Sequence, residues 1–317
     1  MRCTICKKEA VYEARYSGAF LCQTHFSQSV ERRVRREARS QIRLENRKGT
    51  IAVAISGGKD SSLTLKMIHE LYSKWKGVSL FAFTIDEGIS GYRENGLASA
   101  RRLCESMGIP HFVLSYEEAF GTTMDREVSG DPGGIPCSKC GPMRRNLINR
   151  ASLKVNADYV ALGMNLDDYA QSVMMNVVRG DYDRLKRMAP HEAPVGGMVR
   201  RVTPLRLIPE KEVLLYCMLQ GIEYDHSWCP YYGGAQRNYF RAMIDGLESE
   251  FPGSRFAILK FADRIRTGRL EKKAGGPGAC IRCGSPTSAA LCPVCRMTAQ
   301  GHEIPGNNPL FDQLPMA

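Results

Sequence analysis

Residues 50–61 read Thr-Ile-Ala-Val-Ala-Ile-Ser-Gly-Gly-Lys-Asp-Ser and decide the fold of this 317-residue chain. An apolar, β-branched run leads into a glycine-rich turn, and a helix-compatible segment, 62–74, follows directly. A strand, a glycine turn and a helix start in this order surround an anion with backbone N–H groups, which is a common way to bind phosphate. The common P-loop needs glycine where this chain has Val53 and Ser or Thr where it has Asp60. A tight turn without a ligand is the alternative interpretation.

Composition limits the classes of protein to which the chain can belong. It carries 44 Lys and Arg against 33 Asp and Glu, a formal charge of +11, and 43% of its residues are hydrophobic. No apolar run approaches the ~18 residues of a membrane span, and the N-terminus lacks the apolar stretch of a secretory signal. We therefore expect a cytoplasmic protein without a membrane segment. The positive charge favours a nucleic acid as partner, although many soluble proteins are mildly basic for other reasons.

Twelve cysteines in a reducing compartment indicate metal ligands rather than disulfides. Two groups have the spacing of a closed tetrahedral zinc site, and redox-active dithiols or chance are the alternatives. The groups are Cys3, Cys6, Cys22 and His25, and Cys280, Cys283, Cys292 and Cys295. Each segment is too short to fold without a metal, so two Zn²⁺ ions are expected. Cys104 and Cys217 stand among apolar neighbours and are interpreted as buried packing residues.

Residues 30–48, between the first zinc group and the glycine-rich turn, combine an apolar stripe with many arginines. Val30, Val34, Ala38 and Ile42 recur every fourth residue, which predicts a helix. Eight basic and three acidic residues give this segment a net charge of +5. A solvated helix face would explain the pattern, but beside a zinc ribbon we interpret it as a surface that contacts phosphates.

Between residue 50 and about residue 265, predicted strands alternate with predicted helices. The strands are 50–55, 78–85, 111–115 and 158–162, and the helices are 62–74, 94–107, 142–155, 167–178 and 210–219. This alternation predicts an α/β fold, a doubly wound parallel sheet with helices on both faces. Ligands of such sheets lie beyond the carboxyl ends of the strands, where segments 56–61, 86–88 and 163–168 fall.

The predicted domain organisation has five parts. They are an N-terminal zinc ribbon (1–28), a basic connecting helix (29–49), an α/β nucleotide-binding domain (50–273), a C-terminal zinc ribbon (279–298) and a tail (299–317). A Gly- and Pro-containing linker, 274–278, leads into the second ribbon.

Three further cysteines suggest the reaction. Cys137 and Cys140 lie in a Gly- and Pro-rich segment that is expected to be a loop, and Cys229 lies in a second loop. Neither segment offers a convincing fourth ligand, although His226 is a candidate. Three thiolates from loops can hold an iron–sulfur cluster with one iron left open, which could bind sulfide and present it to an activated carbon. A zinc site with a water, a persulfide-carrying pair and a structural role are the alternatives.

Asn165, Asp167 and Asp168 follow a predicted strand. Asn165 suits a helix N-cap, and an acid in the first turn stabilises a helix, which explains one acid. Two acids beside a Gly-x-Asn turn indicate contact with Mg-ATP.

The hexapeptide Ser56–Ser61 resembles the PP-loop of the ATP pyrophosphatases, which cleave ATP between the α- and β-phosphates and adenylate a substrate. With both zinc groups and the three cysteines, the chain resembles the two-zinc-ribbon tRNA 2-thiolation enzymes over residues 1–295. These are the cytoplasmic wobble-uridine thiolases of archaea and eukaryotes and the TtuA enzymes, which act on a T-loop uridine. Segments 86–93 and 179–181 are more similar to the wobble-uridine branch.

The resemblance implies a PP-loop ATP pyrophosphatase domain flanked by zinc ribbons. Such an enzyme adenylates the C2 oxygen of a tRNA uridine with ATP and Mg²⁺, after which sulfide displaces AMP. Cys137, Cys140 and Cys229 would hold a 4Fe-4S cluster, Lys59 would steady the departing pyrophosphate, and Asp168 rather than Asp167 would contact Mg-ATP. The nucleotide site would be lined by Ala54, Ile55, Ser56, Gly57, Gly58, Lys59, Asp60, Ser61, Ile85, Arg144, Gly163 and Asp168.

Three positions depart from patterns in this group. Relatives usually carry His where Met164 stands and Glu where Tyr169 stands, and a methionine can neither hydrogen-bond a phosphate nor move a proton. Arg144 falls where TtuA has a lysine near ATP; it keeps the charge but not the point-like geometry.

The resemblance also implies partners. A tRNA would bind to 30–48, the ribbons and 264–273, sulfur would come from free sulfide or a ubiquitin-like carrier protein, and a homodimer is expected. The alternative functions are thiolation of a T-loop uridine or of cytidine, an ammonia-using amidotransferase, and a non-catalytic zinc-ribbon RNA-binding protein. Ammonia chemistry has no use for the three cysteines, and intact Lys59, Asp60 and Ser61 argue against a pure binder.

Overall fold

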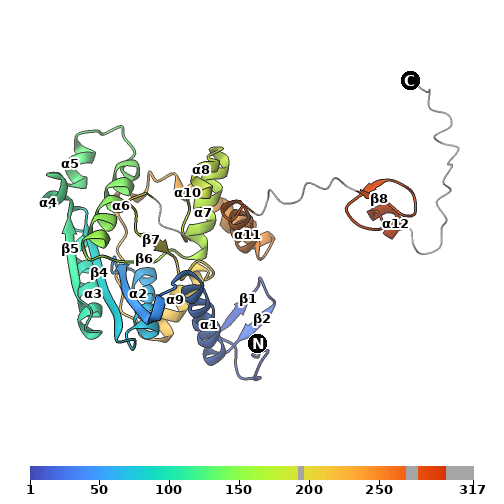
Figure 1. The fold of residues 1–317 in the computed structure, drawn as a ribbon, viewed down its shortest axis with the longest axis horizontal. Coiled ribbons are helices and arrows are strands. Elements are labelled where there is room, and N and C mark those ends of the chain that lie inside the picture. Colours follow the sequence, from blue (N-terminus) through green and yellow to red (C-terminus); the bar gives the residue numbers. More distant parts are fainter. Residues whose placement is uncertain (192–195, 269–277, 298–317) are drawn as a thin grey trace. The chain divides into compact units, whose positions relative to one another are not determined.

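The computed structural model describes residues 1–191, 196–268 and 278–297 and divides into two compact units, Met1–Thr267 and Gly268–Ala317. The first unit contains a central sheet and its helices (Figure 1). The second contains the C-terminal cysteine group. Within the described part of the chain, no helix has both the length and the hydropathy that crossing a bilayer requires.

A five-stranded parallel sheet forms the centre of the first unit (Figure 1). The strand order is β5-β4-β3-β6-β7, and all neighbours are parallel. The chain runs outward from β3 to β5 and then returns to the other side of β3, so the predicted doubly wound sheet is confirmed. The strands are β3 (Lys48–Ala54), β4 (Gly77–Asp86), β5 (His111–Ser115), β6 (Tyr159–Leu162) and β7 (Arg200–Val202). Ligands of such sheets bind where the order reverses, which here is between β3 and β6.

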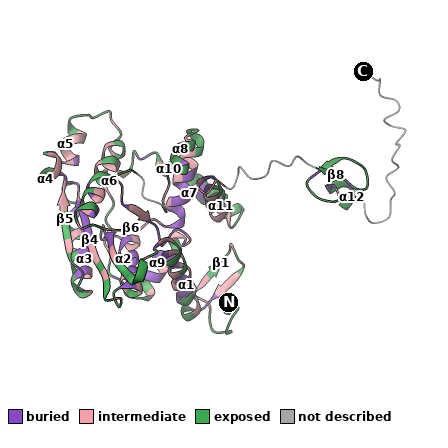
Figure 2. Ribbon diagram, viewed as in Figure 1, coloured by how far each residue is buried: buried purple, intermediate pink, exposed green. Residues whose placement is uncertain are grey.

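Helices cover both faces of the sheet, and Figure 2 shows the buried residues concentrated in the sheet and the helices beside it. Ile51 and Val53 of β3 pack with residues of α1, α2 and α3, whereas Ala52 packs with Ile148 and Ala151 of α6. Burial on both faces is typical of a parallel strand. The helices are α1 (Gln23–Gln41), α2 (Lys59–Tyr72), α3 (Arg93–Ser106), α4 (Tyr116–Phe120), α5 (Met124–Ser129), α6 (Pro136–Lys154), α7 (Leu166–Val178), α8 (Tyr182–Lys186), α9 (Glu210–Leu219), α10 (Arg237–Glu250) and α11 (Ser254–Arg266), with 3-10 turns η1 (Glu45–Arg47) and η2 (Pro230–Tyr232).

The four predicted strands and five predicted helices of this domain are present, but the start predicted for α6 was wrong. This helix begins at Pro136, so Cys137 and Cys140 lie in its first turns and not in a loop. Proline suits the first helical position, because its missing N–H would have no partner there. Pro142 inside the helix removes one hydrogen bond without ending it.

The N-terminal segment joins a hairpin of β1 (Tyr12–Ala14) and β2 (Ala19–Leu21) to α1. The predicted apolar stripe is confirmed, since Val30, Val34, Ala38 and Ile42 are all buried. The helix spans Gln23–Gln41 instead of 30–48. Arg33 is bound to Glu212 of α9 and to the carbonyl oxygen of Leu207, whereas Arg32, Arg36, Arg39 and Arg43 are exposed.

In the second unit, β8 (Gly278–Ala279) and β9 (Pro286–Thr287) pair antiparallel before α12 (Pro293–Met297). The predicted tail (299–317), most of the predicted linker (274–277) and the basic residues at 269–273 lie outside the described residues.

Candidate active site and metal centres

The turn that joins β3 to α2 is folded by its own hydrogen bonds. The Ser61 hydroxyl accepts a bond from the Ser56 N–H (3.0 Å) and donates one to the Gly58 carbonyl oxygen (2.9 Å). Gly57 has a φ of +85°, and a Cβ atom there would lie 2.1 Å from the carbonyl oxygen of Gly96, so only glycine fits. The first N–H groups of α2 have no partner within the helix, which makes the turn suited to bind phosphate.

Lys59, the first residue of α2, is held by two carboxylates. Its Nζ lies 3.0 Å from Asp60 Oδ2 and 2.8 Å from Glu210 Oε1. Burial alone lowers the pKa of Lys59, but the negative charges of Asp60 and Glu210 outweigh burial and raise the pKa above its usual value. The side chain therefore stays cationic and can neutralise phosphate.

Asn165 and Asp168 form a capping box at the start of α7, so the predicted N-cap is confirmed. The Asn165 side-chain amide also donates to Asp60 Oδ1 at 2.9 Å, which places Asp168 and Asp60 on either side of one asparagine. Burial raises the pKa of Asp168 to about 6 although the Arg237 guanidinium opposes it, and the charges of Asp60 and Glu210 add to the rise.

Asp167 has structural partners. Its Oδ1 lies 2.7 Å from Arg255 Nε of α11, and its Oδ2 accepts a hydrogen bond from the Glu210 N–H at 2.7 Å. Asp167 thereby fixes the start of α9. The role of Asp168 in contacting Mg-ATP stays a prediction.

Three charged residues complete this network and were not assigned a role from the sequence. Arg237 Nη1 of α10 lies 3.1 Å from Asp168 Oδ1, and Arg241 Nη1 lies 2.9 Å from Glu210 Oε2. Glu210, which begins α9, thus bridges Arg241 and Lys59. The amphipathic pattern of the segment after Cys229 would have revealed α10, with its two arginines one helical turn apart.

A run of polar contacts connects the turn to Cys140. Arg93 Nη1 donates to the Ser56 carbonyl oxygen (3.4 Å), and Arg93 donates twice to the Glu87 carboxylate, at 2.6 and 2.7 Å. Glu87 is completely buried and lies 3.0 Å from Arg144 Nη2. That same nitrogen donates to the Cys140 sulfur at 3.3 Å. The turn and Cys140 are therefore only three side chains apart.

Cys140 and Cys229 pack against the same apolar cluster, together with Met143 and Tyr231. Cys137 is exposed, and the other two thiols are half-buried. Burial raises the pKa of Cys229, and negative charge on Cys140 and Cys137 adds to the rise. The Cys229 sulfur is thus close enough to Cys137 and Cys140 to feel charge on them, although it comes from the loop before η2 and they come from α6.

Other predicted nucleotide-site residues lie at the carboxyl ends of β3, β4 and β6. Ala54 ends β3, Ile55 follows it, and Ile85 of β4 packs in the apolar cluster beside Cys140. A Cβ at Gly163 would lie 2.7 Å from the Ser61 nitrogen, so this close approach to α2 of the residue after β6 requires glycine. Their contact with ATP, like that of Arg144, stays a prediction.

Five further residues that the sequence singled out have other surroundings. Met164 packs against the apolar cluster of α7 and α11, and Tyr169 is buried in that cluster beside the Arg206 guanidinium. Met164 and Tyr169, the two departures from the family pattern, therefore pack in the hydrophobic core. Cys104 and Cys217 are fully buried, which raises the pKa of each to about 12 and confirms them as packing residues. His226 packs against Tyr224, with ring centroids 4.4 Å apart and the ring planes tilted by 47°.

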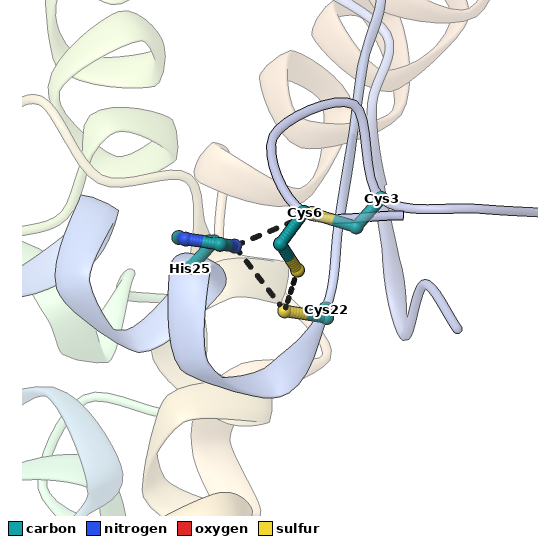
Figure 3. Close-up of side chains that lie close together, drawn as sticks. All are labelled: Cys3, Cys6, Cys22 and His25. Carbon is teal, nitrogen blue, oxygen red and sulfur yellow. Dashed lines mark hydrogen bonds between the residues drawn. The ribbon is translucent and has the colours of Figure 1, made fainter. Parts of the chain in front are cut away.

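The N-terminal cysteine group converges on one point (Figure 3). The sulfurs of Cys6 and Cys22 are 3.6 Å apart, and His25 Nδ1 lies 3.4 Å from the sulfurs of Cys3 and Cys22. Tetrahedral zinc with Zn–S bonds of about 2.3 Å separates two sulfurs by about 3.8 Å, so the group fits zinc. Burial alone would raise the pKa of Cys3, but backbone N–H groups lower it to about 5 and favour the thiolate that zinc binds.

The C-terminal group has the same character. The sulfurs of Cys283 and Cys292 are 3.7 Å apart, and backbone N–H groups point at sulfur, from Cys292 to Cys280 (3.3 Å) and from Cys295 to Cys292 (3.4 Å). The first of these bonds is the main reason that the pKa of Cys280 falls to about 6. Both groups can therefore bind zinc.

Comparison with known families gives two matches along the chain. Residues 26–245 match the family described as the PP-loop domain. Residues 2–27 match the N-terminal LIM domain of the 2-thiouridine synthetase TtuA.

Individual proteins are similar over nearly the whole chain. The tRNA 2-thiolation protein NcsA of Haloferax volcanii is 36% identical, covering 94% of this chain and 98% of its own. Cytoplasmic tRNA 2-thiolation protein 1 of Danio rerio is 33% identical, covering 93% and 87%. Among solved structures, the U34-tRNA thiolase NcsA of Methanococcus maripaludis, with its 4Fe-4S cluster, is 32% identical with a TM-score of 0.74, covering 95% and 97%.

Proposed function

Because the chain belongs to the PP-loop family of tRNA 2-thiolation proteins, we propose that it is an ATP-dependent enzyme that replaces the C2 oxygen of a tRNA uridine with sulfur. The observation that carries this proposal is the run of contacts from Ser56 through Arg93, Glu87 and Arg144 to Cys140. A site that activates the base and a site that supplies sulfur are then neighbours, as two-step thiolation requires.

In the first step the uridine C2 oxygen attacks the α-phosphorus of ATP, pyrophosphate leaves, and N3 loses its proton. The turn 56–61 and Lys59 hold the phosphates, and Asp60 and Asp168 supply the carboxylate oxygens that Mg²⁺ prefers. In the second step hydrosulfide attacks C2, AMP leaves with the original oxygen, and the hydrosulfide proton restores N3–H. The protein contributes mainly positioning and neutralisation of charge.

Cys137, Cys140 and Cys229 fit a 4Fe-4S cluster, because they supply three thiolates and Arg144 complements negative charge at Cys140. When bound through three cysteines, such a cluster supplies an iron with an open position for sulfide. A persulfide on two of the cysteines is the alternative source of sulfur.

The wobble uridine is the substrate that we propose, because the solved relative is a U34-tRNA thiolase and segments 86–93 and 179–181 resemble that branch. The exposed arginines of α1, which are Arg32, Arg36 and Arg39, offer a surface for tRNA phosphates. A sulfur donor that is free sulfide or a ubiquitin-like carrier protein, a homodimer and a cytoplasmic location complete the proposal.

The test uses the full chain, purified without oxygen, with tRNA, MgATP and sulfide. We expect AMP, pyrophosphate and 2-thiouridine in equal amounts, and no product from a tRNA whose wobble uridine is replaced by cytidine. A tRNA altered only at its T-loop uridine serves as the matched control and should remain a substrate. Release of neither AMP nor pyrophosphate would identify a pure RNA-binding protein, and product at the T-loop would identify a TtuA-type enzyme.

Zinc content gives a second prediction. We expect two zinc ions per chain and one after Cys22→Ser or Cys292→Ser, because each group needs all four ligands. Elemental analysis of the purified variants measures this. The matched controls are Ile5→Ala and Ile281→Ala, which alter exposed apolar residues between the paired cysteines and should keep both ions. An unchanged zinc content in either cysteine variant would contradict the assignment of that group.

A further inference from the structure

Three cations and three carboxylates alternate around the start of α2. Lys59 and Arg241 share the carboxylate of Glu210, and Arg237 binds Asp168. Asp60 completes the set, with one bond from Lys59 and one from Asn165. The cluster is neutral in total, so its cations are balanced without a ligand.

The two α10 arginines are accessible to a ligand. The side chains of Arg237 and Arg241 are 39% and 29% exposed, although both are ion-paired. Arg241 Nε is buried and has no hydrogen-bond acceptor in the part of the chain that the structure describes. A buried, unsatisfied guanidinium N–H costs free energy, and a phosphate oxygen is an acceptor that would satisfy it once the side chain turns from Glu210 toward a ligand.

From these contacts we infer that Arg237 and Arg241 bind the β- and γ-phosphates of ATP and hold the pyrophosphate as it leaves. This inference rests on the proposed function, because it requires ATP to bind at the turn 56–61. Residues four apart on a helix lie on one face, so both guanidinium groups reach toward the cluster that contains Lys59. Arginine presents several N–H donors in a plane and binds phosphate through two of them at once.

The exchange of partners leaves every charged group next to an opposite charge. Lys59, Arg237 and Arg241 would turn from Asp60, Asp168 and Glu210 to the phosphates, and the carboxylates would then be free to hold Mg²⁺. The N–H donors then point at phosphate oxygens instead of Asp168 and Glu210. No covalent bond of the protein changes, and no proton is transferred.

The experiment measures the affinities of the metal-loaded full chain for MgATP, magnesium pyrophosphate and AMP by calorimetry. In Arg241→Gln and Arg237→Gln we expect the affinities for ATP and pyrophosphate to fall at least about tenfold, the size expected for a lost charge-assisted hydrogen bond. The affinity for AMP should change less than about twofold. Arg241→Lys should restore part of the loss, and the control Arg126→Gln, an exposed arginine paired with Glu117, should leave all three affinities unchanged.

The outcomes separate the inference from the proposed function. If the unaltered protein fails to bind ATP, the proposed function itself is wrong. If it binds ATP and the glutamine variants lose AMP and ATP affinity together, or lose only tRNA affinity, the inference is overturned. If these variants unfold, amide hydrogen exchange of the unaltered protein provides the test. ATP and pyrophosphate, but not AMP, should slow exchange in α10. Equal effects of all three ligands would contradict the inference.

Discussion

Cys140→Ser is expected to abolish formation of 2-thiouridine while tRNA-dependent release of AMP and pyrophosphate continues. The sulfur of Cys140 lies in the site that we assign to sulfur transfer, whereas the turn 56–61 and Lys59 are untouched. Loss of a residue that hydrogen-bonds a metal ligand typically lowers metal affinity or activity about 10–100-fold. Loss of a ligand itself should therefore lower the rate of thiolation at least about 100-fold. Liquid chromatography of nucleosides from the treated tRNA measures the product.

Iron content distinguishes a cluster from a persulfide. Anaerobically purified protein should contain about four iron atoms per chain, and Cys140→Ser, Cys137→Ser and Cys229→Ser should each lose them. The matched control is Ser138→Ala, because Ser138 is exposed and lies between two of the cysteines on the same turn of α6. An unaltered protein that makes 2-thiouridine with no iron would favour the persulfide.

The parts of the fold that the sequence predicted are those with a local signal. The strand and turn at 50–61 and the paired zinc ligands each depend on residues that are neighbours in the chain. The four-residue spacing of Val30, Val34 and Ala38 likewise indicates one buried face of a helix. Strand β7 was not predicted, because it has only three residues, too few to show a hydrophobic period.

The contacts that complete the site could not be predicted, because they form between residues far apart in the chain. Glu87 follows β4, yet one of its partners, Arg144, is on α6. Glu210 meets Arg241 only because α9 and α10 both reach the start of α2. At α6 the sequence misled for a different reason, since Gly141 and Pro142 are usual helix breakers but lie inside this helix.

Glu87→Gln is expected to destabilise the first unit and disturb both halves of the site. The Glu87 carboxylate is completely buried and pairs with Arg93, itself only 7% exposed, and with Arg144. Glutamine has the same shape but no charge, so two guanidinium groups lose their counter-ion. Removing one partner of a buried ion pair typically costs about 3–5 kcal/mol, and denaturant unfolding of the zinc-loaded protein should show a loss of this size.

The matched control is Glu117→Gln, because Glu117 also pairs with an arginine, Arg126, but both side chains are about 60% exposed. Solvent screens such a pair, so the control should unfold like the unaltered protein. Because Arg93 contacts Ser56 and Arg144 contacts Cys140, Glu87→Gln should also reduce both ATP affinity and iron content. Equal unfolding midpoints for the two variants would mean that Glu87 does not hold the arginines, and the link between the nucleotide turn and the cysteines would then lose its central residue.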